Sequence, residues 1–358
     1  MRNTVFSVTA VLMVVSALPL SGQQPVAVDR LPSAVLDAAP PSAWIQGERG
    51  QMTVQRRECR DFPPSEIRRR IVDIAAQEWA FFGFPVLDRM NDLRVLPPGS
   101  VGNPHQPIVE PSQGRAPVFN LQESIRLDPT IAGYWAVTPE GPGIVSTQNR
   151  AWNGNGNAGI RWRSPWSAAF ISWVMCEAGL GGNDRFRRAI AHRSYIDQAI
   201  RARDGQAPQA AFVAYDLGER AVEPGDLLCA ARRPMYRNIA ERRRQLGVGA
   251  NSHCDIVVEV DEAGGRILAI GGNVLRAVSL KVFPALPRAE GGVRPSPEAS
   301  GRPLFAHLKL QAAPIEADAL TGTPTLRAFA CDPGDPAGGR GAYILSELAV
   351  GPSPGVFC

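Results

Sequence analysis

The stretch SPWSAAFISWVMCEAG, residues 164–179, is apolar almost throughout and carries a hydroxyl near its start. Ser164 is a favoured N-cap residue, and Pro165 suits the first helical position. The pattern predicts a buried helix with Ser167 as its third residue, beside unpaired N–H groups and the positive end of the helix dipole. That position favours a nucleophile and could stabilise an oxyanion. The alternative is that Ser167 is a small residue chosen for packing.

Helical patterns precede this stretch and strand patterns follow it. A helix is expected from Pro64 to about Phe82, with a short helical piece at 133–135, and another over 184–202. Residues 140–161 are rich in Gly and Asn and favour a mobile loop. Short apolar runs rich in β-branched residues predict strands at 226–230, 255–260, 266–270, 277–283 and 304–310. This order indicates an α+β fold, with N-terminal helices packed on a small antiparallel sheet.

The chain divides by composition into four parts. Residues 1–22 have a basic start, an apolar run and small residues, as in a secretory signal peptide. Residues 23–60 are Pro-, Ala- and Gln-rich and expected to be extended, 64–312 hold the predicted core, and 313–358 form a Gly/Pro-rich tail. No other stretch reaches about 18 uninterrupted apolar residues. We therefore expect a periplasmic or secreted protein with no transmembrane segment in its mature chain.

A histidine and an asparagine meet in the predicted hairpin. If Val260 pairs with Arg266 across the turn 261–265, Asn273 falls opposite His253. Directly paired residues project to the same face about 5 Å apart. An imidazole and an amide would then form the base and orienter that nucleophilic catalysis needs, although one bulge would break this register.

Five motifs together resemble a known bacterial family. They are PWSAAFISWVM (165–175), AHRSY (191–195), GDLLC (225–229), HCDIVV (253–258) and IGGNV (270–274). Over residues 64–312 they resemble the family called domain of unknown function 2272. The order of nucleophile, His and Asn also resembles the papain-like peptidoglycan hydrolases, including the cysteine, histidine-dependent amidohydrolase/peptidase group. Those proteins begin the helix with Trp-Cys, where this chain has Trp166-Ser167.

The resemblance implies a papain-like core and an exported hydrolase that cleaves amide bonds in peptidoglycan peptides. Ser167 would be the nucleophile, His253 the base and Asn273 the orienter. A serine cannot form a thiolate in advance, so its proton must be removed during attack. The chain could therefore instead be an esterase, or a non-catalytic protein that binds peptidoglycan or a peptide in the same cleft.

Three further residues are candidates for substrate contacts. Trp166 precedes the nucleophile, and helical spacing places His192 and Tyr195 on one face. His192 and Tyr195 would line the pocket or form a hydrogen-bonded structural pair. Asp226 and Asp255 could orient groups near the site, or serve as solvated or turn-capping residues.

The six cysteines suit an oxidising compartment. Cys229 and Cys254 lie on successive strands and are candidates for a disulfide. Cys331 is expected to pair with Cys358, with Cys59 as the rival partner. There is no CxxC pair and there are four histidines, so we expect no metal and no cofactor.

The formal net charge of +4 is mild. It suits an anionic envelope polymer and does not point to nucleic acid. The arginine runs 68–70 and 242–244 are best interpreted as solvated helix faces, because no aromatic residues alternate with them. The oligomeric state has no signal in the sequence.

Overall fold

The computed structural model describes residues 29–55, 57–88, 121–154, 161–296 and 303–330. The predicted signal peptide and the Cys331–Cys358 pair lie outside these residues. Within them, no helix combines the length and the apolar character needed to cross a bilayer.

Helices and strands alternate irregularly along the chain. The helices are η1 (Pro41–Trp44), α1 (Pro64–Phe81), α2 (Leu121–Ala136), α3 (Gly141–Asn153), α4 (Ser167–Glu177), α5 (Arg193–Arg203), α6 (Ile239–Arg243) and α7 (Pro324–Ala330). The strands are β1 (Ile45–Gln46), β2 (Thr53–Val54), β3 (Val86–Asp88), β4 (Phe212–Tyr215), β5 (Leu227–Arg233), β6 (Asn251–Asp261), β7 (Arg266–Val274), β8 (Ala277–Pro287), β9 (Val293–Pro295) and β10 (Leu304–Leu310).

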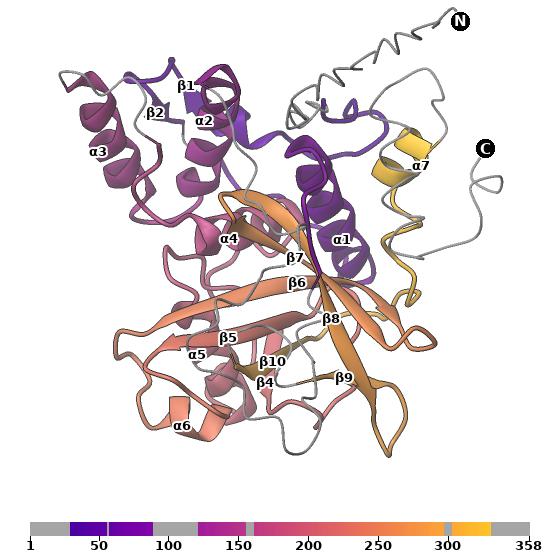
Figure 1. Ribbon diagram of the computed structural model, residues 1–358. Coiled ribbons are helices and arrows are strands. Elements are labelled where there is room, and N and C mark those ends of the chain that lie inside the picture. The colour runs from indigo at the N-terminus through magenta and orange to yellow at the C-terminus, as the bar shows by residue number, and fades with distance from the viewer. Residues whose placement is uncertain (1–28, 56, 89–120, 155–160, 297–302, 331–358) are drawn as a thin grey trace, which may run out of the picture.

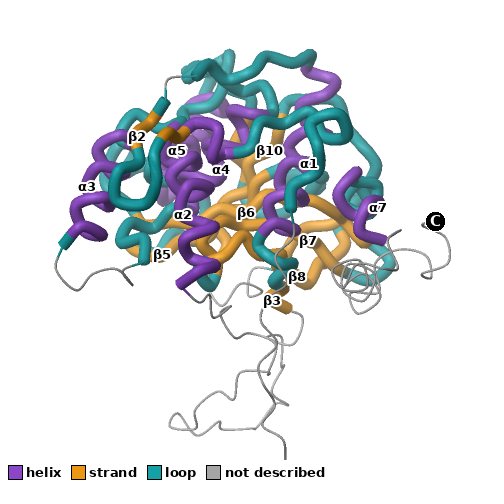
Figure 2. The backbone as a smooth tube through the Cα atoms, turned by 90° about the horizontal axis from the view of Figure 1, so that it is seen from above, coloured by secondary structure: helices purple, strands orange, loops and turns teal. Residues whose placement is uncertain are grey.

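One large sheet has the strand order β3-β8-β7-β6-β5-β10-β4, with β9 paired to β8. Its neighbours are antiparallel except β3 and β8, which are parallel. The predicted α+β class is confirmed, and the sheet is mixed rather than wholly antiparallel. Figure 1 shows α1 and α4 above the long strands β6 and β7, and α5 and α6 below them, near β4 and β5. Figure 2 shows α1, α2 and α4 from above, together with the strands of the sheet.

Both faces of the sheet are buried, and residues alternate between them. In β5, Leu227 and Cys229 belong to the large core shared with the helices, while Leu228 and Ala230 belong to a smaller core on the opposite face. This follows from the two-residue period of a strand. It also explains why the strands appear in the sequence as continuous apolar runs rather than alternating ones.

Helix α4 is buried along its whole length, as its composition predicts. It begins at Ser167 with Trp166 as the N-cap residue, so Ser167 is its first residue and not the third as predicted. It lies close to β7, where a Cβ at Gly272 would approach the Cβ of Phe170 to 2.5 Å. A glycine is therefore required at this crossing.

Two predictions about surface segments are wrong. Residues 141–153, expected as a loop, form α3, because Val145 and Trp152 are buried against the core and outweigh the Gly/Asn composition. Arg68 and Arg242, expected on solvated faces, are 1% exposed and form buried ion pairs with Asp226 and Asp197.

Candidate functional site

Ser167 forms its hydrogen bond with His192 and not with His253. The distance from Ser167 Oγ to His192 Nε2 is 2.7 Å, and both side chains are buried. Ser167 begins α4, whereas His192 is the residue that precedes α5. His253 lies next to His192, with a distance of 5.2 Å between the ring centroids. The three residues therefore form one cluster in which His192 bonds the hydroxyl and lies next to the second imidazole.

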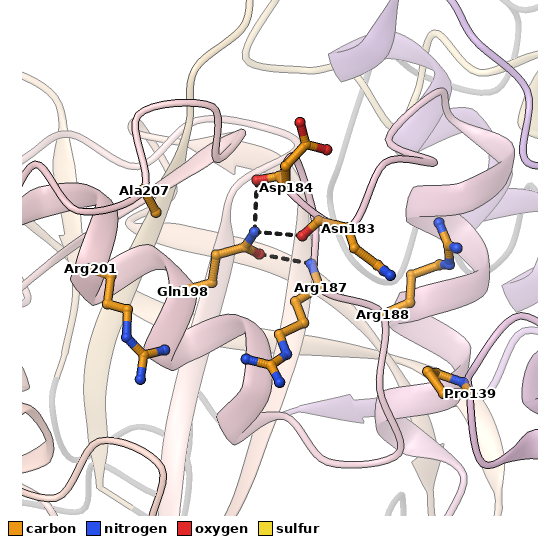
Figure 3. Close-up of a pocket in the computed structure, with 8 residues that line it drawn as sticks. All are labelled: Pro139, Asn183, Asp184, Arg187, Arg188, Gln198, Arg201 and Ala207. Carbon is orange, nitrogen blue, oxygen red and sulfur yellow. Dashed lines mark hydrogen bonds between the residues drawn. The ribbon is translucent and has the colours of Figure 1, made fainter.

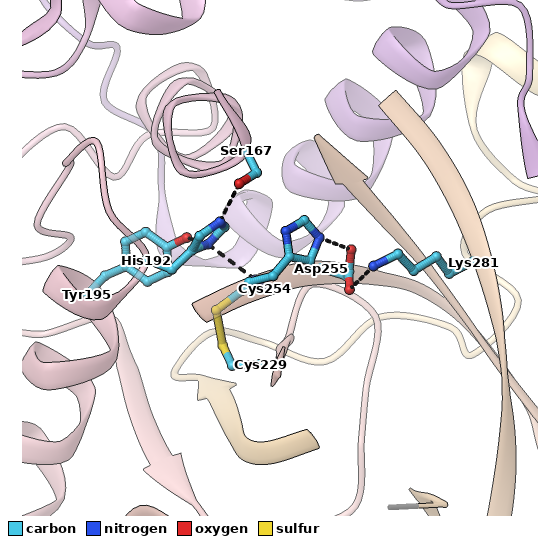
Figure 4. The surroundings of a disulfide bond; sticks show 8 residues. Ser167, His192, Tyr195, Cys229, Cys254, Asp255 and Lys281 are labelled. Carbon is cyan, nitrogen blue, oxygen red and sulfur yellow. Dashed lines mark hydrogen bonds and ion pairs between the residues drawn. A yellow bond between two sulfur atoms is a disulfide. The ribbon is translucent and has the colours of Figure 1, made fainter. Parts of the chain in front are cut away.

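The surroundings of His192 fix which of its nitrogens carries the proton. The backbone N–H of Cys254 donates to Nδ1 at 3.2 Å, and the Tyr195 hydroxyl also bonds Nδ1 (Figure 4). Burial raises the pKa of Tyr195, so the phenol keeps its proton and donates it. With Nδ1 accepting, the neutral ring carries its proton on Nε2 and donates to Ser167 Oγ. His192 is thus a hydrogen-bond donor to the serine and not a base for it.

His253 has the opposite arrangement. Its Nε2 lies 2.9 Å from Asp255 Oδ1, and the other carboxylate oxygen accepts from Lys281 Nζ at 2.8 Å. Because an ionised carboxylate only accepts, Nε2 carries the proton and the neutral ring has its lone pair on Nδ1. That Nδ1 is buried and has no hydrogen-bond partner among the described residues. It is a candidate general base.

Burial and charge set the protonation of this cluster. Burial lowers the pKa of both His192 and His253, so both rings are neutral near pH 7. Burial by itself would raise the pKa of Asp255, but the charge of Lys281 and the bond to His253 hold it well below its usual range. The dyad is therefore a neutral imidazole beside an ionised aspartate.

The first turn of α4 offers unpaired donors beside the hydroxyl. The first intrahelical bond runs from the N–H of Phe170 to the carbonyl of Trp166. The N–H groups of residues 167–169 have no backbone acceptor among the described residues. Such groups can stabilise negative charge that develops on a carbonyl oxygen near the serine.

Asn273 does not take the predicted orienting role. At the turn Asp261, not Val260, pairs with Arg266, and a bulge between Val257 and Glu259 then restores the predicted register at Val257–Ala269 and Ile256–Ile270. The β6–β7 ladder then ends at Ile256 and Ile270, and Asn273 has a left-handed φ of 55°. The hairpin therefore does not continue far enough to place Asn273 opposite His253, and Asn273 forms no hydrogen bond with it in the described chain.

Asp255 occupies the orienting position instead. Residues two apart on a strand project to the same face, and Asp255 is two residues after His253 on β6. The spacing His-x-Asp inside a strand was the signal for this pair. Gly271 completes the arrangement, because a Cβ there would lie 2.0 Å from Asp255 Oδ1 and 3.0 Å from His253 Nε2.

The three candidates for substrate contact differ in environment. Trp166 is 2% exposed and stacked between Phe82 and Tyr134, with centroid distances of 5.7 and 5.6 Å. It has almost no surface to offer a ligand, so the prediction of a direct contact is corrected to one of packing. His192 and Tyr195 do form the hydrogen-bonded pair that was one of the two alternatives.

A disulfide braces the strand that carries the site. Cys229 and Cys254 are bridged, as expected for cysteines on successive strands, and they are directly paired across β5 and β6. Cys254 lies between His253 and Asp255, and its N–H is the donor to His192. The second disulfide joins Cys59 to Cys176, which removes Cys59 as a partner for the C-terminal tail.

Part of the chain matches a family of known sequences. Residues 128–301 match the family model described as "Uncharacterized protein conserved in bacteria (DUF2272)". No curated protein and no solved structure matches the chain. The matched region contains Ser167, His192, His253 and Asp255, and it supports the expectation that this part of the chain belongs to that family.

Proposed function

We propose that this protein is an exported serine hydrolase that cleaves an acyl bond, with an amide of a cell-wall peptide as its substrate. The observation that carries the proposal is the unpartnered, buried Nδ1 of His253, whose ring is held by Asp255 beside the Ser167–His192 pair. A buried ring nitrogen that lacks a hydrogen-bond partner costs stability. Such a cost is typical of a group retained for proton transfer.

The proposed reaction gives each residue of the cluster a role. Ser167 Oγ attacks the carbonyl carbon while its proton moves to His253 Nδ1. The N–H groups at the start of α4 receive the oxyanion, and His192 Nε2 donates to the serine oxygen before attack. His253 then gives its proton to the leaving amine, and water hydrolyses the acyl-serine by the same route.

Two disulfides agree with the proposed export, because such bonds persist in oxidising compartments. The cell-wall peptide is proposed from the resemblance to papain-like peptidoglycan hydrolases. An ester is the easier target for a serine that has no preformed negative charge, so both bond types belong in the test.

The test compares purified protein with three variants on isolated sacculi and on a p-nitrophenyl ester. Ser167→Ala and His253→Ala should lower the rate by about 100-fold or more, and Asn273→Ala should leave it within about threefold. Release of new amino termini from sacculi identifies an amidase or endopeptidase, and turnover of the ester alone identifies an esterase. Binding to sacculi with no turnover of either substrate would reject the hydrolase in favour of a non-catalytic binding protein.

A further inference from the structure

A groove lined by arginines runs beside α5, apart from the serine cluster. Two adjoining hollows of about 520 and 280 Å³ share Pro139, Arg187, Arg188 and Arg201 in their walls. The smaller hollow adds Arg193, which lies at the start of α5. We call these four arginines, at positions 187, 188, 193 and 201, the arginine groove. Figure 3 shows Arg187 and Arg201 extending toward the same side, with Gln198 between them.

None of the four guanidinium groups is neutralised by a carboxylate within the described chain. The side chains of Arg187 and Arg201 have no hydrogen bond or ion pair there. Arg193 meets only the carbonyl of Gly247, at 3.3 Å. Arg188 donates to the carbonyls of Val137 and Gly181, and burial lowers its pKa. Arg187 is exposed and the other three arginines are half-buried. Half-buried positive charge without a carboxylate, as at Arg188, is a costly arrangement that an anionic ligand would relieve.

The acids near the groove do not cancel its charge. Asp197 projects from α5 between Arg193 and Arg201, but both of its oxygens accept from Arg242 at 2.7 Å. Glu140 lines the smaller hollow and Asp184 the larger one. Four arginines against these two free acids leave an excess of two positive charges in the groove.

The rim of the groove is held in place by Gln198. Its Oε1 accepts from the backbone N–H of Arg187 at 2.7 Å, and its Nε2 donates to the carbonyls of Asn183 and Asp184 at 2.9 and 2.8 Å. The loop that carries Arg187 is thereby fixed against α5. Because this backbone is already fixed, the loop loses less entropy when a ligand binds.

The spacing of the arginines selects a ligand longer than a single phosphate. Arg193 and Arg201 are eight residues apart on α5, which corresponds to a rise of about 12 Å. Guanidinium groups bind carboxylate and phosphate oxygens by bidentate hydrogen bonds. We propose that the arginine groove binds an extended anionic ligand whose carboxylate or phosphate groups are separated by about 12 Å.

The experiment measures binding of two fluorescent probes, a hexaglutamate peptide and a linear hexaphosphate, to the full chain. We expect one or both to bind, and the double variant Arg187→Gln/Arg201→Gln to weaken binding by at least about tenfold. Arg237→Gln, which removes an exposed arginine outside the groove, should change the affinity less than twofold. Preference for one probe tells a carboxylate ligand from a phosphate ligand.

Further outcomes decide the proposal. A shallower dependence of log Kd on log salt in the double variant supports direct contact, since fewer charges are then neutralised. Arg187→Lys/Arg201→Lys keeps the charge but loses the bidentate geometry, and should bind with intermediate affinity. Equal affinity of native and double variants, an equal loss in Arg237→Gln, or displacement by inorganic phosphate at the same concentration as by hexaphosphate would each overturn the proposal. The rate at which the double variant hydrolyses the p-nitrophenyl ester is measured separately. It shows whether a loss of probe binding is independent of the proposed hydrolase activity.

Discussion

At the scale of single residues, the two histidines differ in the hydrogen bonds that fix their tautomers. Cys254 donates to Nδ1 of His192 and so places that ring's proton on Nε2, facing Ser167. His253 and Asp255, which flank Cys254 in sequence, form their own pair with the free lone pair on His253 Nδ1. In the proposed hydrolase, the three consecutive residues 253–255 would therefore supply the base, the group that fixes the His192 tautomer, and the orienter.

A thiol at position 167 should report whether the site activates a nucleophile. In Ser167→Cys, the start of α4 and the neighbouring imidazoles should depress the thiol pKa and raise its reaction rate with iodoacetamide at pH 7 by about tenfold or more over an ordinary cysteine. Peptide mapping after timed alkylation measures this at residue 167 itself. The same thiol in a His253→Ala background is the control. If the two thiols react at the same rate, His253 does not act on position 167.

Asp255 and Asn273 can be distinguished as orienters. Asp255→Asn should lower kcat of the proposed hydrolysis by about 100-fold or more, because an amide can present its N–H to His253 Nε2 and reverse the tautomer. Asn273→Ala should retain most of the rate, since Asn273 forms no hydrogen bond with His253. Steady-state kinetics on the ester decide this. Greater loss in Asn273→Ala than in Asp255→Asn would restore the hairpin hypothesis.

At the scale of helices and strands, the sequence was most informative where packing follows a simple period. The last strand was predicted at 304–310 and is β10 with those bounds, and α1 ends within one residue of the prediction. The loop prediction at 140–161 is wrong for 141–153, because α3 is stabilised by tertiary burial of Trp152, which composition does not reveal.

The site was predictable in its members but not in its pairing. Ser167, His192 and His253 do gather, and the predicted register returns beyond the bulge, but the ladder stops at Ile256 and Ile270 and Asn273 takes a left-handed φ. A register argument detects neither the bulge nor the end of the ladder in advance, because both leave the apolar pattern of the strand almost unchanged. The i, i+2 spacing of His253 and Asp255 needs no register and was the safer signal.

The β6 strand also carries a carboxyl that should make stability depend on pH. Burial raises the pKa of Glu259 to about 8, against an ordinary value of 4.5. Between these values the folded chain holds a proton that the unfolded chain has lost. The free energy of unfolding should therefore fall as pH rises through this window, by roughly 5 kcal/mol in total.

Glu259→Gln should remove most of that dependence, because the amide has no proton to lose. Urea unfolding at pH 5.5 and 8.5 measures it, with the difference between native and variant isolating Glu259 from the histidines. The variant should gain stability relative to the native chain at the higher pH. Parallel pH profiles for both proteins would show that Glu259 is ionised in the folded state.

At the scale of the whole molecule, a buried charge cluster joins the helix layer to the sheet. Arg68 of α1 donates to Asp226 Oδ1 at 2.8 Å and to the carbonyl of Leu310 at the end of β10. His307 of β10 bonds the other oxygen of Asp226 at 2.8 Å. His307 thus has a partner that the sequence did not identify. This second His–Asp pair resembles the one at the site, but it lies with an arginine and is wholly buried.

The two His–Asp pairs should respond differently when their aspartate is replaced by asparagine. Burial by itself would raise the pKa of Asp226, but His307 and Arg68 lower it to about 2. This depressed pKa should contribute about 2 kcal/mol above pH 4, and the contribution is lost as pH falls toward 2. Asp226→Asn leaves the buried Arg68 with only the more distant and partly exposed Glu223, at 3.5 Å, as a carboxylate partner in the described chain, and should reduce the free energy of unfolding by about 3 kcal/mol.

Asp255→Asn should be the milder change for folding, because Lys281 is partly exposed and can turn toward water. It should cost activity more than stability, whereas Asp226→Asn should cost stability more than activity in the fraction that folds. Urea unfolding followed by circular dichroism and by tryptophan fluorescence measures stability, and the ester rate per folded molecule measures activity. Asp37→Asn, which breaks an exposed ion pair with Arg60, is the control and should cost less than about 1 kcal/mol. An Asp226→Asn protein as stable as this control would mean that the Arg68–Asp226 pair contributes little to holding the helix layer against the sheet.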